Sequence, residues 1–342
     1  MTALAPPATR PAPTRRSSTP DLVRWLVRLH RPALLVWVGL VLVLGGLLLW
    51  LGGPLTDASA QAWKQYDACK TSSCHYDQDA IGRYKDWYTY TTVAVLVLPF
   101  LVAAWSGAAL IGRELERGTA QLAWTQSISP ARWLAAKLAL PGVLVAVGSG
   151  LLVALHHWAW STGQGRIDTA KRWYDTGTYA ANGTIVVALA LAGLAAGALI
   201  GLARREALSS LVGGLGATGI LWAAIDRVTP HLWPTVTHVS GLSHEHPTGN
   251  GISVTQGLLT STGARIHTPD CGSVTYLPCK DVYAKLDAVS YFNDYHPRSH
   301  YWPLQLTSTA LVLAVAAALT LAAFQILQRR TASAPARKES AV

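Results

Sequence analysis

Six long apolar runs that contain no Asp, Glu, Lys or Arg constrain this chain more than any other feature. Each run reaches or nearly reaches the ~20 residues that an α-helix needs to cross ~30 Å of hydrocarbon. Backbone amides in lipid must pair within their own segment, so helices are the expected form. Only 13% of the 342 residues are charged, which leaves too few polar helices to cover a soluble core of this kind. The runs are Pro32–Leu55, Trp87–Gly112, Leu138–Trp160, Thr176–Ala203, Ala207–Ile225 and Ser299–Gln328.

We predict an all-α polytopic membrane protein with six transmembrane helices, an N-terminal interfacial helix and a large folded outer loop between helices five and six. Residues 1–20 are rich in Pro, Ala and Thr and are expected to form a disordered cytosolic tail. Residues 21–31 combine apolar side chains with arginines, which is typical of a helix lying in the membrane interface. The transmembrane domain covers residues 21–328, with expected spans at about 33–53, 89–111, 138–160, 180–203, 207–225 and 303–327. Its outer loops are expected at 54–88, 161–179 and 226–302, and its inner hairpin at 112–137. A cytosolic tail at 329–342 follows this domain.

The distribution of charge predicts the orientation of the chain. With the N-terminus inside, the inner segments carry 16 basic and 5 acidic residues, whereas the outer segments carry 12 and 13. This asymmetry agrees with the positive-inside rule and places both termini in the cytosol. It also accounts for the net charge of +10 without nucleic acid, which we do not expect as a partner.

All four cysteines fall on the predicted outer side, where oxidising conditions favour disulfides. Cys69 and Cys74 share the first outer loop, and Cys271 and Cys279 share the last. Of the three possible connectivities, the two local pairs are the most economical. Free or metal-bound thiols remain the alternative.

The last outer loop is about 70 residues long and is expected to fold. Residues 252–259 and 274–279 have strand or short-helix character, and residues 281–292 have the pattern of an amphipathic helix. His244 and His246 flank Glu245 and could bind a metal with a third ligand, but the following Pro247 favours a solvated turn. No metal is predicted.

Gly193, Gly197 and Gly201 recur every four residues within the fourth run. Small residues at this spacing let two helix backbones approach closely in lipid. We predict that they form a helix-packing face, either within the chain or between two copies.

The hairpin at 112–137 is a short charged segment between two apolar runs. Arg113, Glu114, Glu116 and Arg117 crowd the end of the second run. A helix C-terminus disfavours carboxylates, so we interpret this group as a contact for a partner protein.

The same hairpin has the signals of an elbow. Gly118 is a natural helix stop, and residues 120–126 fit a short second element. Ser129 and Pro130 then fit the N-cap and first position of the next helix.

The sequence contains no strong enzyme motif. It lacks G-x-x-x-x-G-K-[ST], so it has no usual loop for ATP phosphates, and it also lacks H-E-x-x-H, G-x-S-x-G and C-x-x-C. We therefore predict neither an enzyme nor a cofactor in this chain. Trp105, Ser106, Thr218 and Trp222 lie within spans and are weak candidates for contact with an amphipathic substrate.

The run R-E-L-E-R-G-T at 113–119, followed by S-x-S-P-A-R-W-L-A-A-K-L, resembles the type-2 permeases of ABC exporters, especially those of high-GC Gram-positive bacteria. The run Y-H-P-R-S-H-Y-W-P-L-Q at 295–305 is similar to the approach to the last span in that group. With the six-span layout, the resemblance covers most of residues 21–330.

The resemblance implies a dimer of permeases, either two identical chains or close paralogues, in a bacterial plasma membrane. It implies that each inner hairpin binds a separate ABC ATPase subunit, which binds the ATP and Mg²⁺. Glu114, Glu116, Gly118 and Thr119 match the family's E-x-E-x-G-T pattern, and Arg132 and Lys137 match its downstream basic positions.

Two other functions stay open from the sequence. A non-transporting sensor or scaffold would bind a metal, peptide or envelope component through its outer loop. An intramembrane enzyme would use His156, His157 or Asp226, but the sequence suggests no further polar residues near them.

Overall fold

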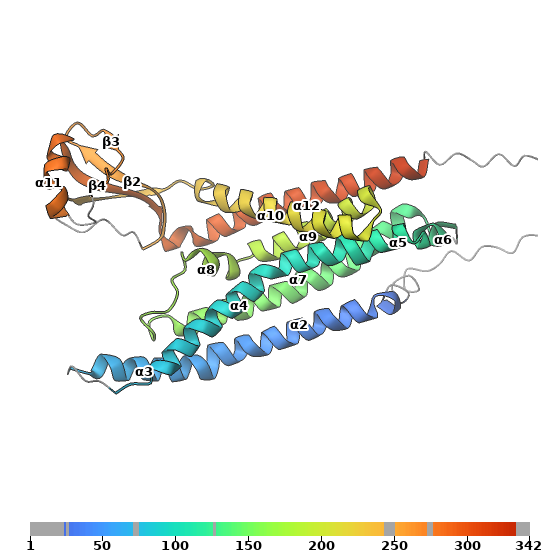
Figure 1. The fold of residues 1–342 in the computed structure, drawn as a ribbon, viewed down its shortest axis with the longest axis horizontal. Helices are drawn as coiled ribbons and strands as arrows, with labels where there is room; N and C mark the ends of the chain where they lie inside the picture. The colour runs from blue at the N-terminus through green and yellow to red at the C-terminus, as the bar shows by residue number, and fades with distance from the viewer. Residues whose placement is uncertain are drawn as a thin grey trace, which may run out of the picture.

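The fold is a bundle of helices with a small sheet at one end (Figure 1). The computed structural model describes residues 24, 27–70, 75–125, 128–242, 250–271 and 276–332. Within these residues, six helices are long and apolar enough to cross a membrane, as predicted. They comprise α2 (Arg31–Trp50) with α3 (Thr56–Ala68), α4 (Gln78–Trp105) with α5 (Arg113–Glu116), α7 (Pro130–Gly163), α9 (Ile185–Arg204), α10 (Ala207–Val228) and α12 (Tyr301–Ala332).

The first two of these helices are much longer than a bilayer requires. Two π-helical turns, η1 (Leu51–Leu55) and η2 (Ser106–Gly112), join their parts into continuous helices of 38 and 39 residues. At 1.5 Å per residue each is about 57 Å long, nearly twice the hydrocarbon thickness. The expected outer loop at 54–88 is therefore largely helical, because α3 and the start of α4 pack on each other beyond the spans.

Helix α9 lies at the centre of the bundle and packs against α4, α7, α10 and α12. Its glycine face makes this possible, because a Cβ at Gly197 would lie 2.7 Å from the amide nitrogen of Gly107 in η2. A Cβ at Gly193 would lie 2.7 Å from the Pro99 carbonyl oxygen, and one at Gly201 would lie 3.0 Å from Ile111. The glycines thus bring α9 against the backbone of α4 and η2 within one chain.

The long loop after α10 folds into an antiparallel sheet. Its strands β1 (Val236–Gly241), β2 (Ile252–Thr260), β3 (Arg265–Ile266) and β4 (Ala288–His296) are ordered β1-β4-β2-β3. Two short helices accompany this end of the molecule: α8 (Thr176–Ala181) precedes α9, and α11 (Tyr276–Lys285) precedes β4. The sheet and α5 lie at opposite ends of the bundle (Figure 1). We call the end with the sheet the sheet end and the end with α5 the hairpin end.

The strand character of residues 252–259 is confirmed by β2, but the helix predicted over residues 281–292 is correct only as far as Lys285. The helix α11 ends at Lys285, and Asp287 follows in the left-handed region at φ 53°. Residues from Ala288 onward form β4 instead, which pairs with β1 on one side and β2 on the other. Pairing with two distant strands outweighs the local helical periodicity.

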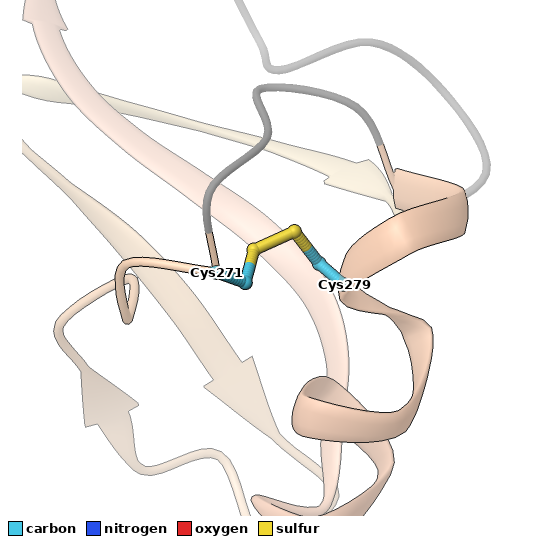
Figure 2. Close-up of a disulfide and its surroundings, with 2 residues drawn as sticks. All are labelled: Cys271 and Cys279. Atoms are coloured by element: carbon cyan, nitrogen blue, oxygen red, sulfur yellow. A yellow bond between two sulfur atoms is a disulfide. The ribbon is translucent and has the colours of Figure 1, made fainter.

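A disulfide joins Cys271 to Cys279, as the local pairing predicts (Figure 2). It connects the chain after β3 to α11 across a Cα–Cα distance of 5.6 Å. Cys279 is buried in the small core that Leu258, Tyr283 and Tyr291 form under the sheet. Cys69 is disulfide-bonded, and Cys74 lies outside the described residues.

Some other predictions also lie outside the described residues. These are the tail at 1–20, most of the tail at 329–342, and the His244–His246 group. Of the expected interfacial helix at 21–31, Arg24 and residues 27–29 are helical.

We expect Gly197→Ala to destabilise the bundle, because the new methyl group would press on the backbone of η2. Overpacking of this kind costs about 1–3 kcal/mol. The matched control is Gly216→Ala on α10, where a Cβ meets nothing within 4 Å. Thermal unfolding of both purified variants in detergent tests this, and an equal effect of the two would contradict close packing at Gly197.

Candidate functional site

The hairpin end carries the elbow that the sequence predicts. Helix α5 ends at Glu116, Gly118 adopts the left-handed region at φ 70°, and α6 (Thr119–Thr125) follows. The Ser129 side chain then accepts a hydrogen bond from the Arg132 amide at 3.4 Å as the N-cap of α7. The start of α2 and the end of α12 lie at this same end (Figure 1).

Lys137 of α7 is completely buried beneath this elbow. Its ammonium donates to Glu114 Oε1 at 2.5 Å and to the Leu110 carbonyl at 2.9 Å, and it lies 3.3 Å from His30 Nε2. It also lies 5.2 Å from the centre of the Trp133 ring. A lysine ammonium has three donors, and three acceptors surround it here. We call Lys137, Glu114, His30 and the Leu110 carbonyl the Lys137 cluster.

The Lys137 cluster joins three segments of the chain. His30 precedes α2, Leu110 belongs to η2 and Glu114 to α5, while the lysine comes from α7. A buried charge is tolerated only when it is paired and hydrogen-bonded, so the three segments must stay together to keep the ammonium satisfied.

The second carboxylate of the elbow binds a different helix. Glu116 Oε2 accepts a hydrogen bond from the backbone amide of Ala207 at 2.9 Å. Ala207 is the first residue of α10, where free amides and the helix dipole favour a negative charge. Helix α5 therefore contacts α7 through Glu114 and α10 through Glu116.

These contacts change the interpretation of the two glutamates. The sequence suggested that carboxylates at a helix C-terminus need a partner protein, but each has a partner within the chain. Lys137, a predicted basic position for partner contact, is buried rather than presented at the surface. Local sequence could not indicate this, because the ligands come from segments far apart in the chain.

Other predicted site residues lie at the surface. Arg113, Arg117 and Thr119 are exposed, whereas Gly118 and Arg132 are partly buried. Leu122 on α6 is 62% exposed. On the opposite side of α6, Trp124 packs edge-on against Trp133 at 5.6 Å.

A second buried polar cluster, which the sequence did not indicate, lies nearer the sheet end. Both ring nitrogens of His156 have partners: Nε2 lies 2.9 Å from Thr92 Oγ1, and Nδ1 lies 2.6 Å from Asn182 Oδ1. Tyr301 also donates to the Asn182 carbonyl at 2.9 Å. The expectation that no polar residues lie near His156 is therefore wrong. Its hydrogen bonds hold α4, α7 and the turn between α8 and α9 together.

The four weak substrate candidates divide into two pairs. Ser106 donates to the Leu194 carbonyl at 2.7 Å, and Thr218 donates to the Gly214 carbonyl at 2.9 Å, so both hydroxyls are used in packing. Trp105 lines a cavity at the hairpin end, and Trp222 lines one near the sheet end. Within the described part of the chain, no group of three His, Cys, Asp or Glu residues could hold a metal ion.

We expect Glu114→Gln to lower the free energy of unfolding by about 3 kcal/mol, because it leaves the Lys137 ammonium buried without a counter-ion. Adding Lys137→Met should recover most of that loss by removing the charge. Glu116→Gln is the matched control and should cost less than about 1 kcal/mol, because an amide oxygen still caps α10. Titration with SDS in mixed micelles measures the free energy of unfolding of all three variants. A double variant that is no more stable than Glu114→Gln would refute the ion pair between Glu114 and Lys137.

The pH dependence of stability should report on His30. Burial, and then the charge of Lys137, lower the pKa of His30 from 6.5 to about 4. Between these pH values the unfolded chain binds a proton here that the folded chain does not, so stability falls as the pH is lowered through this window. His30→Gln should reduce the loss of melting temperature between pH 7 and pH 4.5. An unchanged pH profile would contradict a neutral His30 in the cluster.

Comparison with known proteins agrees with this architecture. The family described as ABC-2 membrane transporter related matches residues 38–229, which is more than half of the chain. No curated protein and no solved structure matches this chain. The matched region begins in α2 and ends just after α10, so it contains five of the six long helices and the whole elbow. The chain therefore belongs to the ABC-2 membrane transporter related family, as a multi-pass membrane permease.

Proposed function

We propose that this chain is the membrane-spanning subunit of an ATP-driven ABC exporter in a bacterial plasma membrane. A separate ATPase subunit binds ATP and Mg²⁺ and contacts the elbow from the cytosol, where the charge asymmetry places it. The observation that carries the proposal is the Lys137 cluster, because it connects the elbow rigidly to the helices that would have to move.

The elbow offers a route for force into the bundle. A displacement of α5 acts on α7 through the 2.5 Å contact between Glu114 and Lys137. It also acts on α10 through the bond between Glu116 and the Ala207 amide. ATP binding in a partner would favour one arrangement of these helices over another, which is the differential affinity that coupling requires.

Helix α6 is the surface that we assign to the ATPase. Its exposed side carries Gln121, Leu122 and Thr125, while Trp124 anchors the other side to α7. An exposed leucine beside polar side chains would give a second protein an apolar contact within a polar border.

Helix α10 is the surface that we assign to the second permease copy. Leu208, Val212 and Ile220 lie at multiples of four residues and are 74%, 61% and 73% exposed. This row forms one face of a span, and a second copy would cover it. The family assignment and this layout favour a permease over a sensor that acts through its outer loop.

The contact with the ATPase is tested by Leu122→Asp, which places a carboxylate on the exposed face of α6. We expect the purified variant to lose its ATPase subunit, identified by mass spectrometry through its ATP-binding loop, and to lose Mg-ATP hydrolysis. Val289→Asp is the control, because Val289 is 53% exposed on β4 at the opposite end. Retention of the ATPase by Leu122→Asp would overturn the assignment of α6.

The mechanical role of the Lys137 cluster needs a separate measurement. In the combined variant of Lys137→Met and Glu114→Gln, α6 is unaltered but its polar connection to α7 is gone. We expect this variant to retain the ATPase subunit. Its rate of Mg-ATP hydrolysis should be the same whether or not the conditions allow transport. Normal coupling in a stable double variant would show that force does not pass through this pair.

A further inference from the structure

Two neighbouring cavities at the hairpin end share part of their lining. The first, about 450 Å³, is lined by polar and apolar residues that include His30, Trp105, Arg113, Glu114 and Arg117. The second, about 400 Å³, is almost entirely apolar and includes Trp37, Leu40, Leu101, Trp105 and Leu144.

Pro32, Ala33 and Trp105 line both cavities, so the two lie next to each other. We call them together the α2 groove. It lies between α2 on one side and α4, η2 and α7 on the other, and these helices run side by side (Figure 1). Each cavity has the volume of an ordinary small-molecule pocket.

The two ends of the α2 groove differ sharply in chemistry. At the polar end Arg113 and Arg117 are exposed and form no ion pair with another described residue. The one carboxylate there, Glu114, is neutralised by Lys137 at 2.5 Å. The polar end is therefore positively charged at the point where the chain leaves the apolar spans.

The apolar end extends along the spans themselves. Leu101 lies about three turns before Arg113 on one continuous helix, and Trp37 lies just inside the start of α2. The Trp37 indole donates to the Leu144 carbonyl at 3.1 Å, so its one polar group is satisfied and the wall stays apolar. A ligand here must be anionic at one end and a hydrocarbon chain at the other.

We propose that the α2 groove binds an anionic phospholipid from the leaflet at the hairpin end. Its phosphate contacts Arg113 and Arg117, and one acyl chain passes Ala33 and Trp105 toward Leu101. Guanidinium groups are well suited to phosphate. The apolar end holds the acyl chain by close packing, because a chain that comes from the leaflet already lies in hydrocarbon. A soluble anion would leave the apolar end empty. A zwitterionic lipid such as phosphatidylcholine carries a cationic group beside its phosphate, and this group would be repelled by the two arginines.

The site lies against the Lys137 cluster, since His30 and Glu114 line its polar end. A bound lipid would therefore contact α2 and α5 at the point where the cluster joins them. Lipid binding itself needs no ATPase, so its test does not depend on the proposed coupling function.

The test is native mass spectrometry of the purified full chain with added phosphatidylglycerol or phosphatidylcholine. We expect phosphatidylglycerol to bind at least ten times more tightly. Arg113→Gln with Arg117→Gln should abolish that preference, and Ala33→Trp should reduce the binding of phosphatidylglycerol at least fivefold by filling the junction. Arg204→Gln with Arg205→Gln is the charge-matched control, because both arginines are exposed at the same end outside the groove.

Three results would overturn the proposal. The first is equal binding of the two lipids by the unmodified chain. The second is full competition by inorganic phosphate at the same concentration, which would identify a plain anion site. The third is unchanged lipid binding in either groove variant, with melting temperatures showing that the variant is folded. If the arginine variant instead lost only its ATPase subunit, the two arginines would belong to the interface with that subunit.

Discussion

The ammonium group of Lys137 has no exposure to water, and the rest of the hairpin end is arranged around that fact. A charge in such a place must be neutralised and hydrogen-bonded, or the fold pays a penalty of several kcal/mol. The structure meets this demand with groups from two other segments, the chain before α2 and the continuous helix that contains η2 and α5, so none of these segments is free to move independently. The elbow is thus part of the packed bundle, although its sequence looks like a loop between spans.

This arrangement divides the residues of the elbow into two sets. Glu114, Glu116 and Lys137 fix α5 to α7 and α10. Glu116 is itself exposed, as are Leu122, Arg113 and Arg117, but these last three are available to other molecules. The residues that fix α5 to its neighbours determine how a force on the elbow would be transmitted. The residues available to other molecules determine which molecules could apply or modify that force. A sequence motif that contains both sets does not distinguish them.

The sequence predicted the spans well, because a segment in lipid must lack charges over its whole length and that requirement is local. The elbow shape was equally local, since Gly118 and Ser129 act on their own backbone neighbours. The helix expected over residues 281–292 failed where β4 gains its stability from two distant strands. The burial of Lys137 was not predicted for the same reason, because His30 lies 107 residues away in the chain.

The π-helical turn η2 sets the direction in which the elbow leaves the membrane. It lies between α4 and α5, and its Leu110 carbonyl accepts a hydrogen bond from Lys137. In a helix, one residue more or less rotates everything beyond it by about 100°. Adding or removing a single residue within η2 would therefore turn Glu114 and Glu116 away from α7 and α10. The orientation of the elbow is thus encoded by the length of one seven-residue turn as well as by the chemistry of the side chains below it.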